Sequence, residues 1–402
     1  MTAAPPRPPR PSRPELAPHL LEADALGFAD LLATEDAAVL ARARERFRSA
    51  VQPVVAGCWE QERFPHEVVP ALGELGLVEV ALDPSKALLH GLAHVELASV
   101  DLSMSTFLGV HSLLFANAVH LLGSPAQRAE LLPSALDLST VGAFALTEPE
   151  HGSDISRGLA TTATREGDCW RINGVKRWIG NGTHADVLLV WARDTADHQI
   201  KGFLVPRDAP GVTTSRIEHK TGLRIVQNAD VALVDVLVDD DRRLAGAASF
   251  GDLNTLLTTS RAWVAWQAVG VQVAAYRQAV ACARSREQFG RPVASFQLVQ
   301  DKLVRILDAT TASLAVAVRL AQLQAAGRLR PEHAALAKAG NSTRMREAVA
   351  LGRGVLGGNG ILADHGMART FADAEALYSY EGTHEVNTLV VGRAITGISA
   401  IA

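Results

Sequence analysis

Hydrophobic and polar positions divide the chain into a helical stretch, a strand-rich stretch and a second helical stretch. From about Glu35, apolar residues recur every three to four positions, which is the period of one face of a helix. The repeat is carried by Val39, Ala43, Phe47, Ala50 and Val54. Similar segments run to about Ala135, and breaks are expected near Pro53, Pro84 and Gly123-Ser124-Pro125.

The middle of the chain, about 141–244, has a different texture. Its short apolar runs are separated by turn signals such as Asn181-Gly182, and they span 142–146, 187–191, 202–205 and 231–234. No pattern of a 10–15-residue helix separates them, so a βαβ array is not expected. From about 252 the helical texture returns, with long helices expected over 262–284, from Pro292 to about 326, and from 331 to about 356.

This order predicts an α+β multidomain fold. We expect an extended or disordered arm rich in Pro and Arg over 1–34, and an N-terminal helical domain over 35–140. A middle antiparallel β domain is expected over 141–245, and a C-terminal four-helix bundle over 246–402.

Composition and charge exclude several classes of function. The chain has 402 residues, of which 48% are hydrophobic, and its 39 Lys+Arg against 43 Asp+Glu give a net charge of −4. A non-specific nucleic-acid binder would be strongly basic, so no nucleic-acid partner is expected. Cys58, Cys169 and Cys282 lie far apart without a C-x-x-C, which supports neither a disulfide framework nor a metal site. With no apolar run of membrane-span length and no signal peptide, we expect a cytoplasmic protein without a membrane span.

One apparent motif is set aside. Gly352 to Gly357 matches G-x-G-x-x-G, but the dinucleotide fingerprint follows a strand, and here a helical pattern precedes it.

Three separated stretches carry candidate chemistry. In the first, 144–154 with 176–182, a strand runs into a loop of hydroxyls and glycines that can offer backbone N–H groups to a polar ligand, and Trp178 can supply a flat apolar wall. In the second, 286–292, Arg286 and Arg291 precede a helix start, an arrangement suited to a pyrophosphate. In the third, 356–360 with 378–385, Glu381 before Gly-Thr is placed as a base. Taken singly, each also fits an ordinary turn, a solvated connection or a capping carboxylate.

Together these stretches resemble the acyl-CoA dehydrogenase/oxidase family of flavoproteins. The resemblance begins at about residue 35 and is nearest the branch that holds glutaryl-CoA dehydrogenases and plant-type short-chain acyl-CoA oxidases. It is carried by Trp191-Ala192-Arg193, Ser260-Arg261, Val264-Ala265-Trp266-Gln267, Tyr380-Glu381-Gly382-Thr383-His384 and Gly392-Arg393-Ala394-Ile395-Thr396-Gly397. It implies an FAD cofactor, an acyl-CoA substrate, a homotetramer, and an electron-transfer flavoprotein or oxygen as electron acceptor.

The resemblance also assigns roles to residues. Glu381 matches the catalytic base. The positions that match FAD contacts are Phe144, Leu146, Thr147, Gly152, Ser153, Trp178, Gly180, Thr383 and Glu385, and those that match contacts to the FAD of a neighbouring subunit are Arg286, Phe289, Gln297, Gly357, Gly358 and Asn359. The positions that match the substrate site are Ser105, Ser153, Arg261, Tyr380, Gly382 and Arg393.

The chain departs from the family pattern at three places. Gly180 stands where many members have a Thr that hydrogen-bonds the flavin. The segment 101–111 lacks the Arg with which glutaryl-CoA dehydrogenases bind the distal carboxylate, so glutaryl-CoA is not the expected substrate. Residues 81–92 are shorter than and different from the usual segment.

The resulting functional prediction is FAD-dependent α,β-desaturation of a short, uncharged acyl-CoA in fatty acid metabolism. The alternatives are an oxygen-using acyl-CoA oxidase, a desaturase of acyl groups bound to a carrier protein, a flavin monooxygenase or nitroalkane-oxidase-like relative, and a non-catalytic family member. The presence of Glu381 argues against the monooxygenase-type relatives, which commonly replace the base.

Overall fold

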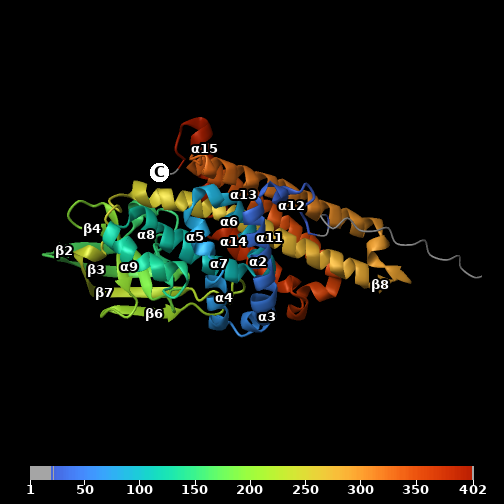
Figure 1. Ribbon diagram of the computed structural model, residues 1–402, viewed down its shortest axis with the longest axis horizontal. Helices are drawn as coiled ribbons and strands as arrows, with labels where there is room; N and C mark the ends of the chain where they lie inside the picture. The colour runs from blue at the N-terminus through green and yellow to red at the C-terminus, as the bar shows by residue number, and fades with distance from the viewer. Residues whose placement is uncertain (1–19, 21, 401–402) are drawn as a thin grey trace, which may run out of the picture.

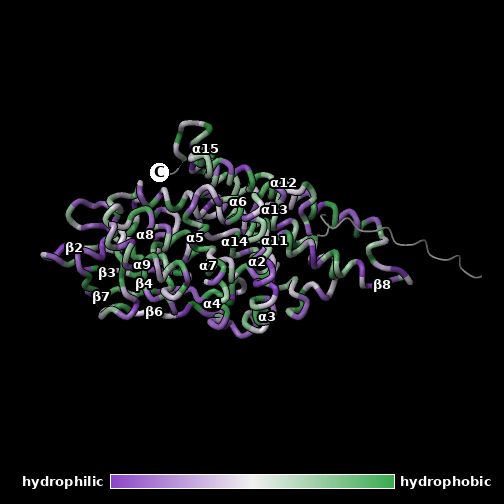
Figure 2. The backbone as a smooth tube through the Cα atoms, viewed as in Figure 1, coloured by the Kyte–Doolittle hydropathy of each residue, from purple (hydrophilic) through white to green (hydrophobic). Residues whose placement is uncertain are grey.

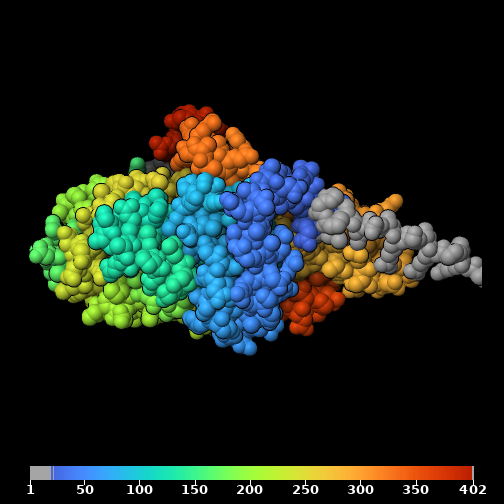
Figure 3. Space-filling view, in the orientation of Figure 1, coloured from blue at the N-terminus to red at the C-terminus, as the bar shows by residue number. Residues whose placement is uncertain are grey.

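The computed structural model describes residues 20 and 22–400. A β domain forms one end of the molecule, the C-terminal helices extend to the other end, and the N-terminal helices lie across the middle (Figure 1). In the space-filling view these N-terminal helices, in blue, cover the visible face between the β domain and the far end of the bundle (Figure 3). The predicted order of helices, strands and helices is confirmed. Most of the predicted arm, 1–19 and 21, lies outside the described residues.

The N-terminal domain consists of short helices. Its elements are η1 (Phe28–Leu31), α2 (Thr34–Arg46), the π-helical turn η2 (Phe47–Val51), α3 (Gln52–Glu60), η3 (His66–Val68), α4 (Val69–Gly73), α5 (Leu77–Leu82), η4 (Pro84–Lys86), α6 (Ala87–Val100), α7 (Leu102–Gly109), the π-helical turn η5 (Val110–Ala116), α8 (Asn117–Leu122) and α9 (Pro125–Leu136). The break expected near Pro53 is wrong, because η2 leads directly into α3 and Pro53 lies in the first turn of α3, where no N–H is needed. The break at Gly123-Ser124-Pro125 is confirmed, and Ser124 forms a capping box with Gln127.

One helical stretch, Leu102–Leu122, has the length and hydropathy of a membrane span. Within that stretch, 94% of the most apolar window is buried inside the protein. Packing in the core therefore accounts for its hydropathy.

The middle domain is a seven-stranded sheet. Its strands are β1 (Gly142–Ala145), β2 (Thr162–Glu166), β3 (Cys169–Ile179), β4 (Val187–Asp194), β5 (Ile200–Pro206), β6 (Val212–Arg216) and β7 (Ala229–Asp239), with the helical turn α10 (Ile155–Gly158) between β1 and β2. The pairs β2–β3, β3–β7, β4–β5 and β6–β7 are antiparallel. However, β4 lies between β1 and β2 and runs parallel to both, so the sheet is mixed rather than antiparallel throughout. Apolar runs indicate strands but not their direction, which is why the sequence did not reveal this.

The C-terminal domain is a bundle of long helices. They are α11 (Phe250–Ser285), α12 (Gln297–Ala325), α13 (Pro331–Leu356), α14 (Met367–Ser379) and α15 (His384–Thr396), and a hairpin of β8 (Glu287–Gln288) and β9 (Arg291–Pro292) joins α11 to α12. Two 3-10 turns, η8 (Gly357–Ile361) and η9 (Ala363–His365), link α13 to α14, and η7 (Val293–Ser295) precedes α12. The helix before Gly357 confirms that the glycine motif there is not a dinucleotide fingerprint.

Helix α11 is the centre of the molecule. It packs against α12, α13 and α14 of its own domain and against α6 of the N-terminal domain. Nearly all its residues from Ala262 to Tyr276 are buried, and Figure 2 shows hydrophobic residues along this central region. A helix that is apolar on all sides needs neighbours on all sides. Glycines allow the closest approach, since a Cβ on Gly91 of α6 would lie 2.2 Å from the Trp266 ring and a Cβ on Gly109 would lie 2.0 Å from the Trp263 ring.

We therefore expect Gly91→Ala to lower the free energy of unfolding by about 1–3 kcal/mol, because overpacking must displace Trp266. Gly57→Ala in α3 is the matched control, since a Cβ there meets no atom within 4 Å and alanine favours a helix. Urea unfolding of both variants and the parent protein measures the difference. Equal stability of the two variants would contradict the close packing of α6 on α11.

Candidate functional site

The candidate base lies in a tight turn between α14 and α15. Glu381 and Gly382 both have left-handed backbones, with φ of 55° and 81°. Lys338 of α13 holds the turn, since its Nζ donates to the carbonyls of Tyr378 at 2.9 Å and Gly382 at 2.7 Å. A non-glycine residue in this conformation is strained, so such anchoring is what keeps it in place.

The next helix fixes the other side of the turn. The Thr383 side chain caps α15 by accepting from Val386 N at 3.2 Å. The Asn387 side-chain amide donates to the carbonyls of Gly382 and Thr383, both at 2.9 Å. The backbone around Glu381 is therefore held from α13 and from α15.

The Glu381 carboxylate lies against α11. The hydroxyl of Ser260 is 2.5 Å from Glu381 Oε2. Burial raises the pKa of Glu381 above its ordinary value, while Ser260, Arg261 and Lys338 act in the opposite direction. Burial lowers the pKa of Lys338 to about 8, and the nearby Glu381 opposes that change. A carboxylate with a raised pKa in a water-poor place is a stronger base than one at the surface.

A chain of hydrogen bonds connects this turn to the N-terminal domain. Tyr380 donates from its hydroxyl to Gln267 Oε1 at 2.7 Å. The Gln267 amide nitrogen donates to Ser105 Oγ at 3.0 Å and to Thr106 Oγ1 at 3.3 Å. The structure thus connects Ser105 of α7 to Tyr380 through Gln267.

The chain continues to a buried histidine. His94 Nδ1 is 2.8 Å from Ser105 Oγ, and the Trp263 indole N–H donates to the same nitrogen at 3.0 Å. Because the indole can only donate, Nδ1 is the acceptor and the ring proton is on Nε2. Burial and the neighbouring His90 lower the pKa of His94 well below its usual range, so this ring is neutral near pH 7.

The end of strand β3 lies on the same helices. The Asn181 side chain donates to the carbonyls of Phe107 and Gly142, both at 3.3 Å, and so joins β3 to α7 and β1. A Cβ on Gly180 would lie 3.3 Å from Val110, which leaves little room for a threonine side chain at this position. Trp178, with φ of 64°, is 51% exposed, and the Arg177 guanidinium lies over its ring at 5.2 Å from the ring centroid.

A buried ion pair shapes the loop that follows β1. Lys176 Nζ lies 2.8 Å from Glu148 Oε1 and also donates to the carbonyl of Leu146 at 3.1 Å. The Glu148 carboxylate accepts further bonds from Ala160 N and Thr161 N, at 2.7 and 2.9 Å. These bonds fix the start of the loop, whereas Gly152 and Ser153 at its tip remain exposed.

The remaining predicted site residues lie elsewhere. The hairpin β8–β9 is at the end of the bundle away from the β domain (Figure 1). Arg286, Phe289 and Gln297 are exposed in and beside this hairpin, and Phe289 is 92% exposed. Gly357, Gly358 and Asn359 follow the end of α13, and a Cβ on nearby Gly354 would lie 3.5 Å from Lys302 at the start of α12. The chain therefore does not bring these six residues to Glu381. Glu385 and Arg393 are exposed on α15.

Sequence reasoning missed four residues that support the site: Ser260, Gln267, Lys338 and Asn387. Ser260 and Gln267 had been quoted only as motif residues of the family resemblance, without a role in the site. Lys338 had a visible signal, because it is a lone charge within the apolar run Ala334-Ala335-Leu336-Ala337-Lys338-Ala339. A lysine at a buried helical position needs a partner, and here the partners are carbonyls.

Comparisons with known proteins agree with this architecture. Three family models match in order: the acyl-CoA dehydrogenase N-terminal domain over 33–138, the middle domain over 143–236 and the C-terminal domain over 250–396. The mitochondrial short-chain specific acyl-CoA dehydrogenase of Bos taurus is 30% identical over 349 residues, which cover 84% of each chain.

Solved structures match along nearly the whole length. Glutaryl-CoA dehydrogenase from Mycobacterium smegmatis is 36% identical with a TM-score of 0.90, over 95% of this chain and 99% of that chain. A glutaryl-CoA dehydrogenase from the same organism in complex with FADH2 is 31% identical with a TM-score of 0.91, over 95% of this chain and all of that one, 100%.

The hydrogen bond from Ser260 leads to a prediction about the pKa of Glu381. A hydrogen bond donated to a carboxylate stabilises its charged form, so Ser260→Ala should raise the pKa of Glu381 further. Infrared difference spectra recorded across a pH titration, which follow the protonated carboxyl band, measure the change. Ser379→Ala is the control, because that exposed hydroxyl donates to the carbonyl of Glu375. A Glu381 titration identical in both variants would show that Ser260 does not tune this carboxyl.

Proposed function

The chain belongs to the acyl-CoA dehydrogenase family, and on that premise we propose that Glu381 is the base that removes the α-proton of a short, uncharged acyl-CoA. Members of the family are oxidoreductases that use FAD. The observation that carries the proposal is the Glu381 carboxylate, half-buried on an anchored turn and hydrogen-bonded to Ser260.

The chemistry requires such a base. The α-proton of a thioester is a poor acid in water, so its removal needs a positioned carboxylate in a dry site. Negative charge then develops on the thioester carbonyl oxygen, and the backbone N–H of Glu381, held by the anchored turn, is the donor we assign to it. When FAD is bound, it would supply the group that is reduced as the β-hydrogen leaves.

The residues at the end of the β domain fit a flavin. The Trp178 ring is half-exposed beside Arg177, and an exposed aromatic ring can accommodate a flat ring system. Gly152 and Ser153 expose small groups on a loop whose start is fixed by Glu148 and Lys176. We propose that these residues, with Phe144, Leu146, Thr147 and Gly180, hold the flavin beside Glu381, and that Thr383 and Glu385 contact it from α15.

We take the segment 101–111 as the inner wall of the acyl site, and its electrostatics favour an uncharged acyl group. The wall segment 101–111 has no Lys or Arg, and its His111 has a pKa lowered to about 4 by burial. His94, behind Ser105, is neutral as well. A second carboxylate on the acyl chain would find no cation there, and burying it unpaired is strongly unfavourable.

The residues that match contacts to the FAD of a neighbouring subunit lie where they support assembly of several copies of the chain. Arg286, Phe289 and Gln297 lie in and beside the hairpin β8–β9, which is at the end of the bundle away from the β domain (Figure 1), and the segment 357–359 follows the end of α13. We propose that they contact the FAD of a second copy, within a homotetramer, and that an electron-transfer flavoprotein takes up the electrons. Cytoplasmic location stays a prediction of the sequence.

We expect Glu381→Gln to keep its flavin and fold but to lose bleaching of the flavin by butyryl-CoA, by about a thousandfold or more in rate, because the amide cannot accept the proton. Anaerobic stopped-flow spectra measure this. Glu347→Gln, which changes an exposed glutamate paired with Arg305, is the control. Full bleaching of the flavin in the Glu381→Gln variant would show that Glu381 is not the base.

We expect butyryl-CoA to exceed glutaryl-CoA by about a hundredfold or more in kcat/KM, since the distal carboxylate would be buried without a partner. Steady-state rates with an artificial electron acceptor measure the ratio. Comparable rates would mean that a cation outside 101–111 binds the carboxylate. Rapid recovery of the bleached flavin in air, with peroxide, would identify an oxidase instead of a dehydrogenase.

A further inference from the structure

An open cavity of about 440 Å³ lies away from the residues assigned to desaturation. It is formed between α2, η2, α3, α6, α11 and the segment 363–369, and neither Glu381, Ser260 nor Arg261 lines it. Four arginines from these elements line the cavity: Arg44, Arg48, Arg277 and Arg369. The size is that of a small-molecule site.

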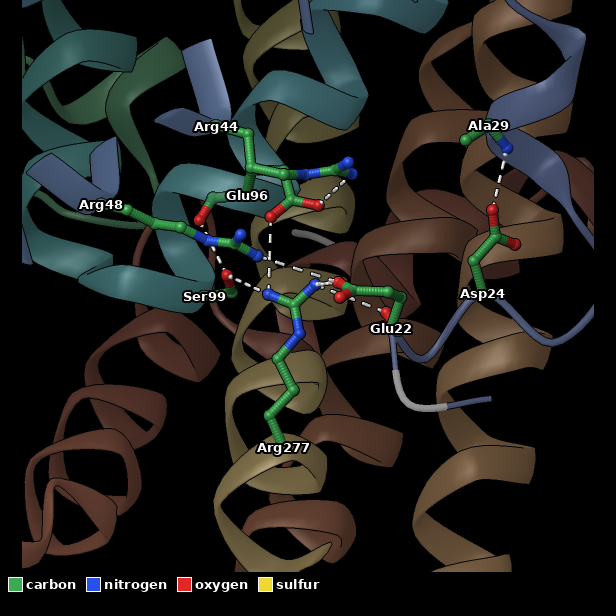
Figure 4. Close-up of polar contacts among 8 residues, drawn as sticks. All are labelled: Glu22, Asp24, Ala29, Arg44, Arg48, Glu96, Ser99 and Arg277. Carbon is green, nitrogen blue, oxygen red and sulfur yellow. Dashed lines mark hydrogen bonds and ion pairs between the residues drawn. The ribbon is translucent and has the colours of Figure 1, made fainter. Parts of the chain in front are cut away.

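An ion-pair cluster centred on Glu96 forms part of the cavity lining. The Glu96 carboxylate, buried on α6, lies 2.7 Å from Arg44 and 3.4 Å from Arg277, and Ser99 accepts from Arg277 at 3.1 Å (Figure 4). Arg369 pairs with Asp101 at 3.6 Å. These contacts hold the Arg277 guanidinium through its NH1 nitrogen, while its second nitrogen, NH2, faces Glu22.

That second nitrogen binds a carboxylate from the N-terminal segment. Glu22 Oε2 lies 2.7 Å from Arg277 NH2 and 4.0 Å from Arg48 NH2, so the carboxylate sits between two guanidinium groups (Figure 4). Among residues 20 and 22–400, Glu22 is the only carboxylate within 4.0 Å of Arg48. When Glu22 moves away, Arg48 loses this neighbour and Arg277 keeps Glu96.

We propose that this cavity binds a small oxyanion, a carboxylate or a phosphate group on a small molecule, and that Glu22 occupies the place of that group in its absence. Paired guanidinium groups match the geometry of both anions. The Glu22 side chain is 50% exposed, and an ion pair at such a position is weak, so a free anion can displace it. This site goes beyond the proposed desaturation and does not depend on it.

The geometry predicts how two substitutions change the affinity for the anion. Glu22→Gln removes the internal competitor, so the fraction of molecules with an open site rises and binding should tighten about threefold. Arg48→Gln removes one of the two guanidinium groups and should weaken binding about tenfold. Arg48 has no other ion pair among the described residues, so its loss should leave the fold intact.

The test is calorimetric titration of the flavin-loaded, full-length protein with glutarate and, separately, with inorganic phosphate. The controls are Arg46→Gln, on the same helical segment but paired with Glu74 outside the cavity, and Glu35→Gln, an exposed glutamate paired with Lys86. Saturable binding of either anion that tightens in Glu22→Gln, weakens in Arg48→Gln and is unchanged in both controls supports the proposal, and the tighter probe identifies the kind of oxyanion. Absence of binding, or equal binding by all variants, overturns it.

Discussion

The contact of Lys338 with the turn before α15 is the constraint on which the candidate site depends. A glutamate whose backbone is left-handed tends to relax to an ordinary conformation, and strain of this kind costs roughly 1–3 kcal/mol. The ammonium group of Lys338 opposes that relaxation by binding the carbonyls on both sides of Glu381. Those carbonyls also accept hydrogen bonds from the buried ammonium group. Without these bonds, burial of the ammonium would cost free energy. The same contact therefore stabilises the lysine and places the carboxylate.

Helix α11 then relates the turn to the rest of the molecule. Ser260 and Gln267 are seven residues apart and lie on one face of the helix, so one contacts Glu381 and the other contacts Tyr380. The same helix carries Trp266 and Trp263, whose rings pack on the glycines Gly91 of α6 and Gly109 of α7. A shift of α11 would move the groups around Glu381 and the inner wall at Ser105 together. The close packing at Gly91 and Gly109 is thus part of what sets the distance between the base and the wall.

The sequence was sufficient for the order of helices and strands, because period and turn residues are local properties. It could not reveal that β4 lies parallel between β1 and β2, since strand direction depends on the path of the chain between strands. The resemblance supplied Glu381 and Arg261, which lie together in the fold, but not the role of Lys338, which is 43 residues away in sequence and acts through backbone carbonyls. The pairing of Glu148 with Lys176 was missed for the same reason: only the folded sheet brings the two side chains together.

The arginine-lined cavity and the candidate active site share α11 but are electrostatically separate. Arg261 and Arg277 are 16 residues apart, which is about 24 Å along a helix. The cavity is open to solvent, where charges are screened over about 8 Å at physiological salt, so an anion beside Arg277 has little direct effect on the Glu381 carboxyl. The two sites are connected through the packing of α6 against α11. Glu96 ties Arg277 to α6, and α6 carries both Gly91, packed on Trp266, and His94, bonded to the inner wall. An ion pair at one end of this helix pair thereby stabilises the same packing that positions the base at the other.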